Sequence, residues 1–212
     1  MVALSSPSLA QSGRLSRCKA RVLAPDALYD RLVVPEAPPE PTETGLAPVG
    51  EGWFVLNARE ACWLQREGWS ASCEFEGDTE FPQVGIFLRV LGPGAPMAMY
   101  HWEADQEGFL VLSGEALLIV EGEERPLRQW DFFHCPAGTK HIIVGAGHTP
   151  CVVLAVGARE HQAGAGWGGY PVDETALRHG AGVEEETSDA AEAYAAFPKF
   201  QPSPYRQGWL PG

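Results

Sequence analysis

The chain has 212 residues, and 45% of them are hydrophobic, which is enough for one sizeable core or for one core with long arms. It carries 28 Asp and Glu against 15 Lys and Arg, a formal net charge of -13, and such an acidic chain repels phosphate backbones, so we expect no nucleic-acid partner. No apolar stretch is long enough to cross a bilayer, so we expect no membrane partner either.

The cysteine content and the N-terminus favour a cytoplasmic location. Five cysteines are present, an odd number, and no two of them form a Cys-x-x-Cys pair. We therefore expect free thiols in a reducing compartment and no zinc cluster built from cysteine. Residues 1–13 have neither a basic start nor a sustained apolar core, so no signal peptide is expected.

Composition divides the chain into three parts. Residues 1–50 are predicted to form an irregular N-terminal arm, since the five prolines between Pro35 and Pro48 suit an extended segment. Residues 51–160 hold many short strand-like segments, and residues 161–212 read as a C-terminal extension with short helices and a Pro-rich tail. No internal repeat is visible, so we expect one barrel rather than two.

The strand predictions begin at Trp53. We predict a strand at Trp53–Asn57, a short helix or turn at Ala58–Arg66, and a half-buried strand at Trp69–Phe75, where residue types alternate with a period of two. Gly108–Leu112 and Glu115–Val120 flank Ser113-Gly114, which favours a β-hairpin. The other predicted strands are Phe81–Val90, Met97–Glu103, Trp130–Cys135, His141–Val144 and Cys151–Val156. Many short strands separated by Gly and Pro indicate an all-β antiparallel barrel or sandwich.

Two short helices are predicted after this series. Asp173 is expected to cap a helix that runs through His179 and ends at Gly180, and Ser188 is expected to cap a second one through Phe197. The tail from residue 198 onward is rich in proline, and we expect it to pack on the barrel or on a neighbouring subunit.

Four side chains of kinds that bind divalent metals define a candidate site. His101 and Glu103 are two residues apart on a predicted strand, so both point to the same face with Cα atoms about 6–7 Å apart. Glu107 follows a turn, and antiparallel pairing would return it to the same neighbourhood. His141 follows the turn Pro136-Ala137-Gly138 and starts another strand. The spacing can therefore bring all four to one ion.

These residues resemble the two motifs of the cupin superfamily. The first motif reads here His101-x-Glu103-x3-Glu107-x6-Gly114, and the second reads Pro136-x-Gly138-x2-His141. The resemblance covers roughly residues 88–156. It implies an antiparallel double-stranded β-helix, the jelly-roll cupin barrel, a bound divalent transition metal ion and a homodimer.

The chain departs from the cupin pattern at three positions. Glu103 stands in place of a second His, Trp130 in place of a Gly, and Gly145 in place of an Asn. Glu103 can be a fourth ligand, giving two His and two carboxylates. Alternatively, it turns away and leaves His101, Glu107 and His141 as a triad with open positions. Either set suits Fe, Mn, Zn or Ni, and ligand type does not choose among them.

The resemblance leaves several functions open. The favoured one is a metal-dependent enzyme of oxygenase or isomerase type, acting on a small organic molecule, with Glu103 as a ligand or as a catalytic general base. The alternatives are a non-catalytic cupin that binds a sugar or organic acid, and a storage protein with a vestigial site. We rank phosphorylated sugars below neutral or weakly acidic substrates, because the only basic residues near the motifs are Arg89, Arg125, Arg128, Lys140 and Arg159.

Overall fold

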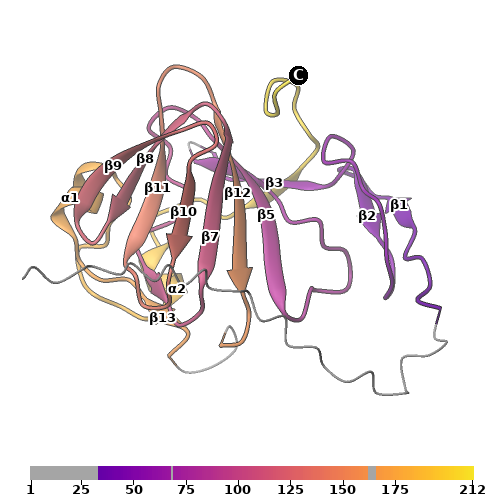
Figure 1. The fold of residues 1–212 in the computed structure, drawn as a ribbon, viewed down its shortest axis with the longest axis horizontal. Helices are drawn as coiled ribbons and strands as arrows, with labels where there is room; N and C mark the ends of the chain where they lie inside the picture. Colours follow the sequence, from indigo (N-terminus) through magenta and orange to yellow (C-terminus); the bar gives the residue numbers. More distant parts are fainter. Residues whose placement is uncertain (1–32, 68, 162–165) are drawn as a thin grey trace, which may run out of the picture. The chain divides into compact units, whose positions relative to one another are not determined.

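The computed structural model describes residues 33–67, 69–161 and 166–212, and Val34–Gly212 form one compact unit. Most of the predicted N-terminal arm, with Cys18, lies outside the described residues. Within the described part the fold is all-β, as predicted, since the strands pair antiparallel and the helices are short (Figure 1). No helix among these residues is long and apolar enough to cross a membrane.

Two sheets enclose the main core. In spatial order, the larger sheet contains β10 (Phe132–Cys135), β7 (Glu107–Ser113), β12 (Cys151–Ala158), β5 (Val84–Leu91), β4 (Ser70–Cys73), β3 (Trp63–Gln65) and β14 (Gln201–Ser203). The smaller sheet contains β11 (His141–Ala146), β8 (Glu115–Val120) and β9 (Glu123–Arg128). Val111 and Val153 of the larger sheet meet Ile119 and Ile143 of the smaller one in a single buried cluster. This arrangement confirms the predicted double-stranded β-helix.

Alternation along the strands decides which side chains enter this core. On β7, Phe109 and Val111 are buried in the cluster, whereas Leu110 between them points to the opposite face of the sheet. On β12, Val153 and Ala155 face the core in the same way. The inner face of the larger sheet is therefore built from alternate residues of neighbouring strands.

The predicted hairpin at Ser113-Gly114 is wrong. β7 pairs with β10 and β12, whereas β8 pairs with β11 and β9, so the chain crosses from one sheet to the other at Gly114. Gly114 has a φ of 77°, and a Cβ on it would lie 2.6 Å from the carbonyl oxygen of Pro150. A left-handed residue pressed against another backbone segment marks a crossing here, and this contact cannot be recognised from local sequence.

Three other strand predictions need correction. Within Trp53–Asn57, only Trp53 makes a bridge, with Glu36, so that segment is not a strand. Within Met97–Glu103, His101 makes one isolated bridge with His141, and only β6 (Trp102–Glu103) is a strand, paired with β13 (Gly168–Gly169). β9, which closes a hairpin with β8, was not predicted, because its charged and exposed residues lack an apolar alternation.

The predicted half-buried strand around residue 70 is buried on both faces. Ser70 and Ser72 are as inaccessible as Ala71 and Cys73, because one face of β4 packs on a second apolar cluster and the other faces the barrel interior. Upstream, β3 occupies part of the segment predicted as a helix or turn. The proline-rich segment forms a small antiparallel pair, β1 (Pro39–Pro41) with β2 (Leu46–Pro48). The domain bounds at residues 50 and 160 stay a prediction.

The C-terminal extension contains two short helices, as predicted, but the second ends at Ala193 rather than at Phe197. Helix α1 (Glu174–Arg178) is capped by Asp173, whose carboxylate accepts a hydrogen bond from the Ala176 amide, and Gly180 ends it with a φ of 66°. Helix α2 (Ala190–Ala193) is capped by Asp189 rather than by the predicted Ser188. The tail packs on its own barrel, where the Trp209 ring lies 5.0 Å from the Trp63 ring.

Candidate metal centre

A pair of backbone hydrogen bonds brings His101 and His141 together. The His101 amide donates to the His141 carbonyl at 3.2 Å, and the His141 amide donates to the His101 carbonyl at 2.8 Å. Their ring centroids are 4.9 Å apart. Both side chains are buried, with His101 8% exposed and His141 0% exposed. The short bridge therefore places two imidazoles side by side inside the barrel.

The outer nitrogen of each ring is held by the backbone. His101 Nδ1 lies 2.7 Å from the Met99 carbonyl oxygen, and His141 Nδ1 lies 3.1 Å from the Thr139 carbonyl oxygen. Cys135 Sγ is a further neighbour of His141 Nδ1, at 3.4 Å. These contacts favour protons on Nδ1, so each ring, when it is neutral, presents Nε2 as an acceptor. Metal-binding histidines are commonly oriented in this way.

Glu107, the first residue of β7, completes a group of three. Its Oε2 atom lies 3.4 Å from His141 Nε2, and ligand atoms of His101, Glu107 and His141 all lie within 4.8 Å of one another. Glu107 Oε2 and His141 Nε2 are both buried and have no hydrogen-bond partner in the described part of the chain. Buried polar atoms are normally paired, so these two fit a cation between them.

Glu103 lies beside this group of three. Its Oε1 atom is 3.4 Å from His101 Nε2, and its side chain is 30% exposed, compared with 13% for Glu107. The structure thus brings all four predicted residues into one neighbourhood, with Glu103 at the solvent side. This position suits either a fourth ligand or a base next to the ion, so both predicted roles remain open.

Without a cation, the buried carboxylate and imidazole groups of the centre are in an electrostatically unfavourable arrangement. Burial raises the pKa of Glu107 to about 7, the Glu103 charge adds to this rise, and His101 opposes it. Burial lowers the pKa of His141 to about 3, and His101 acts in the same direction. For His101 burial favours the neutral ring, but the hydrogen bond to Glu103 and the two glutamate charges outweigh it and raise its pKa. A divalent cation would satisfy both carboxylates and both rings.

A cavity of about 220 Å³ opens beside the ligands. The register of the larger sheet aligns Glu107 with Gly157 and Gly157 with Gly85, so two glycines share a row with a candidate ligand. Gly85 makes room for the Phe87 ring, since a Cβ there would lie 2.7 Å from it, and a Cβ on Gly157 would lie 3.6 Å from Glu107 Cγ. The rest of the lining combines acids, aromatic rings, one alanine and one cation, namely Glu103, Asp105, Phe87, Trp167, Ala158 and Arg159. Apart from Glu103 and Arg159, sequence analysis did not single out these residues, although a glycine inside a strand is a signal of close approach or open space.

The cation of the cavity is already paired. Arg159 donates to Glu76 from both terminal nitrogens, at 2.6 and 3.2 Å, and also to the Phe81 carbonyl oxygen. Nearby, Asp105 accepts hydrogen bonds from the His161 ring and amide at 2.7 and 2.8 Å. Asp105, Glu160 and His161 also have ligand atoms within 4.8 Å of one another, but Asp105 is satisfied without a metal.

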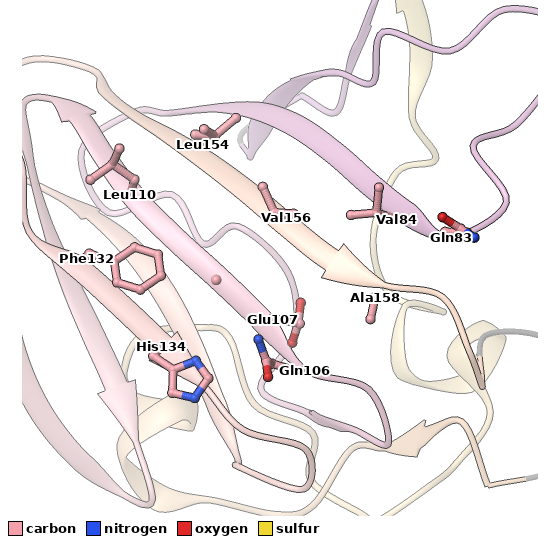
Figure 2. A pocket seen from close by; sticks show the side chains of 11 residues that line it. Gln83, Val84, Gln106, Glu107, Leu110, Phe132, His134, Leu154, Val156 and Ala158 are labelled. Carbon is pink, nitrogen blue, oxygen red and sulfur yellow. The ribbon is translucent and has the colours of Figure 1, made fainter. Parts of the chain in front are cut away.

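A larger pocket of about 430 Å³ lies on the other face of the same sheet. Figure 2 shows its lining, with Leu110, Leu154 and Val156 projecting from β7 and β12 and with Glu107 at one end. His134, which sequence analysis placed outside the metal site, lines this outer pocket and is exposed. The outer pocket is mostly apolar and carries no cluster of ligands, so the smaller inner cavity is the better candidate for chemistry.

The structure bears on two of the three departures from the cupin pattern. A Cβ on Gly145 would lie 2.1 Å from the Gly92 carbonyl oxygen, so the Asn of the usual pattern would not fit here. Trp130 has a φ of 75°, a conformation that glycine adopts without strain, which explains why glycine is usual at this position.

Comparison with known proteins supports the fold and the motifs. Residues 87–157 match the family model described as the cupin domain. These residues therefore form a cupin domain, and the predicted resemblance is confirmed. A search of the curated proteins found no match.

Solved structures with partial similarity include three bacterial proteins. A candidate sugar phosphate isomerase from Acidithiobacillus ferrooxidans is 32% identical over 36% of this chain and 51% of its own, with a TM-score of 0.35. A sugar phosphate isomerase of the cupin superfamily from Silicibacter pomeroyi is 28% identical over 42% of this chain and 59% of its own, with a TM-score of 0.40. A cupin superfamily protein from Desulfitobacterium hafniense is 23% identical over 45% of this chain and 83% of its own, with a TM-score of 0.39. The chain thus spans only about half to three fifths of the first two.

Proposed function

We propose that this protein is a metal-dependent enzyme of oxygenase or isomerase type that acts on a small organic molecule. His101, Glu107 and His141 would hold one divalent ion, which is Fe, Mn, Zn or Ni. The observation that carries the proposal is the pair of buried, unpartnered atoms, Glu107 Oε2 and His141 Nε2, next to a cavity. Two histidines and one carboxylate leave coordination positions open for a substrate.

The bound ion would polarise a carbonyl or enolate oxygen, or bind O₂. The chain's own residues would do the rest. Glu103 lines the cavity and is more exposed than Glu107, so its carboxylate can accept a proton from a substrate held there. Phe87 and Trp167 would cover the reacting centre and limit the access of water.

A binding protein without turnover is the alternative. Glu103 Oε1 already lies 3.4 Å from His101 Nε2, so a small rotation would make it a fourth ligand. Among the described residues that line the cavity, Asp105 is hydrogen-bonded to His161 and Arg159 is paired with Glu76. The centre would then lack a free base, and the protein would hold a sugar or organic acid without converting it.

Two further proposals concern location and assembly. Cys62, Cys73, Cys135 and Cys151 are free thiols, which supports a reducing cytoplasm. The mostly apolar outer pocket and the 65% exposed Phe132 on its rim support a homodimer that covers this face. Light scattering would show a monomer if the dimer proposal is wrong.

The metal proposal is tested by elemental analysis of protein purified without chelators, followed by titration of stripped protein with Mn, Fe, Ni and Zn. We expect one ion per chain in the wild type and loss of binding in His141→Ala. His134→Ala is the matched control, because this His is exposed on the other face of the sheet. A folded protein that contains no metal and takes up none of the four would refute the proposal. O₂ consumption by the iron-loaded protein with enols, thiols and catechols then separates oxygenase activity from binding.

A further inference from the structure

Arg66 and Arg89 lie together inside the barrel, beyond the metal centre. In the register of β5, Arg89 is the partner of Ser72 on β4 and of the buried core residue Val153 on β12. Partners across neighbouring strands share a face, so Arg89 starts from the inner face of the sheet. Arg66 follows β3, and its amide donates to the Ser70 carbonyl at 3.2 Å.

Neither guanidinium forms an ion pair within the described part of the chain, although the Glu74 charge acts on Arg89. Among the described residues, no acidic oxygen lies within 4.0 Å of Arg66 or Arg89, in contrast to the pairs formed by Arg159 and Arg178. Arg66 is only 9% exposed, and its Nε atom is buried without a hydrogen-bond partner, as is the Oγ atom of nearby Ser70. A buried charge in this state is costly unless something else pairs with it.

Aromatic rings lie close to both guanidinium groups. The Arg66 guanidinium lies 4.5 Å from the Phe200 ring centroid and 4.7 Å from the Tyr194 ring centroid. The Arg89 guanidinium lies 5.1 Å from the Phe87 ring centroid. Stacking on rings stabilises a cation but leaves its in-plane N–H donors available. Those donors match the two oxygens of a carboxylate or phosphate group.

Arg89 is also placed in line with the metal centre. Glu107 is aligned with Gly157 on the neighbouring strand, and Gly157 is aligned with Gly85 on β5. Arg89 follows Gly85 by four residues on β5, so these two residues are roughly 13 Å apart along the strand. Phe87 lies between them, because its ring lines the cavity beside Glu107 and also contacts the Arg89 guanidinium. Arg89 keeps part of its surface accessible even though burial lowers its pKa. The Arg89 guanidinium also lies 6.0 Å from the Phe200 ring centroid, so the same ring lies next to both arginines.

We infer that Arg66 and Arg89 form an oxyanion subsite, so that the substrate is a small organic anion. Its carboxylate or phosphate group would bind between the two guanidinium groups, and its other end would reach the metal centre across Phe87. This inference rests on the proposed function. It agrees with the weakly acidic substrates favoured from the sequence and brings phosphorylated ones back into consideration. The reason is Arg66, which was not considered there, whereas Arg125, Arg128 and Lys140 are exposed and Arg159 is paired.

The test uses the full chain after removal of metal, so that an anion cannot bind to the ion itself. Calorimetric titrations with inorganic phosphate, acetate and neutral acetamide are compared. We expect phosphate or acetate to bind at one site per chain and acetamide not to bind. The better of the two anions identifies the class of substrate. Arg89→Met and Arg66→Met should each weaken anion binding roughly tenfold or more, since each removes a charge-assisted donor.

Arg128→Met, which removes an exposed arginine on β9, is the matched control and should leave anion binding unchanged. If Arg89→Met does not fold, then Arg89→Gln and an anomalous bromide signal between the two arginines in wild-type crystals replace it. Wild-type protein that binds neither anion, or equal binding in Arg89→Met, overturns the subsite. Zinc content is measured in parallel for every variant. A chain that takes up zinc but no anion refutes only the subsite, and a chain that binds anion but no metal refutes the proposed function.

Discussion

Glu107 Oε2 lies 3.4 Å from His141 Nε2, and both atoms are shielded from solvent with no hydrogen-bond partner in the described part of the chain. An ionised carboxylate in such a position loses its hydration and forms no hydrogen bond that compensates for this loss. The neighbouring Glu103 charge makes the cost larger, as the raised pKa of Glu107 shows. In the metal-free protein, the ionised Glu107 carboxylate should therefore lower the free energy of unfolding, although the same group is a proposed metal ligand.

Glu107→Gln separates these two effects. At pH 8, where Glu107 with a pKa of about 7 is mostly ionised, the amide should stabilise the metal-free protein by about 1–3 kcal/mol, because no charge is buried. The same change should abolish the rise in melting temperature that we expect metal to cause in the wild type. Calorimetric unfolding with and without zinc measures both. Glu40→Gln, an exposed control, should change neither. A less stable metal-free Glu107→Gln protein would contradict the strained centre.

Glu103→Gln decides between base and ligand. If Glu103 is a base beside the ion, the variant should keep one metal per chain and lose O₂ consumption or isomerase activity. If Glu103 is a ligand, metal affinity should fall by roughly tenfold or more, because a first-row divalent ion loses an anionic donor. Metal titration combined with an activity assay distinguishes the two outcomes. We expect metal to be retained, because Glu103 lies outside the group of three ligand atoms within 4.8 Å of one another.

The ion pair between Arg159 and Glu76 should be important for stability. Both side chains are nearly buried, with 9% and 10% exposed, so Arg159→Met would leave Glu76 buried without its partner. We expect a loss of about 3–5 kcal/mol in the free energy of unfolding. Arg125→Met is the control, since Arg125 and Glu123 are 60% and 66% exposed and their pair should contribute less than about 1 kcal/mol. Urea denaturation measures both, and equal losses would contradict this prediction.

Gly114 should tolerate no side chain. Gly114→Ala places a Cβ 2.6 Å from the Pro150 carbonyl oxygen in a backbone with positive φ, so we expect a loss of more than about 2 kcal/mol or a failure to fold. Gly94 has a similar φ of 74° but nothing within 4 Å of its Cβ position. Gly94→Ala should therefore cost only about 1 kcal/mol, the penalty for the left-handed conformation. The difference between the two variants isolates the contact at the sheet crossing.

The buried thiols should resist alkylation. Burial raises the pKa of Cys73 and Cys151 to about 11 and that of Cys135 to about 12, so the reactive thiolate is rarer at any given pH than in an exposed cysteine. At pH 8, iodoacetamide should label half-buried Cys62 well before these three, and raising the pH should increase their labelling. Peptide mass spectrometry assigns each site. Fast labelling of Cys135 in folded protein would contradict its burial, and denatured protein is the control.

The linear sequence contains the features that depend on spacing along the chain. His101 and Glu103 two residues apart, Glu107 after a turn, and His141 after Pro136-Ala137-Gly138 were enough to predict the family, and the structure places these four side chains together. A capping aspartate followed by a glycine likewise predicted the first helix. Such features can be recognised from the sequence because each depends on a few neighbouring residues and on the alternation of side chains.

Tertiary structure alone decided which strands became neighbours. The hairpin predicted at Ser113-Gly114 does not form. A strand pairs where its apolar face is buried best, and for β7 and β8 these places are in two opposite sheets that share one core. Some residues are aligned across the sheet only because strands far apart in the sequence pair with each other. Glu107 is aligned in this way with Gly85, and Arg89 with Ser72. A cavity or a buried pair of arginines exists only once such rows are assembled, so no local pattern reveals it.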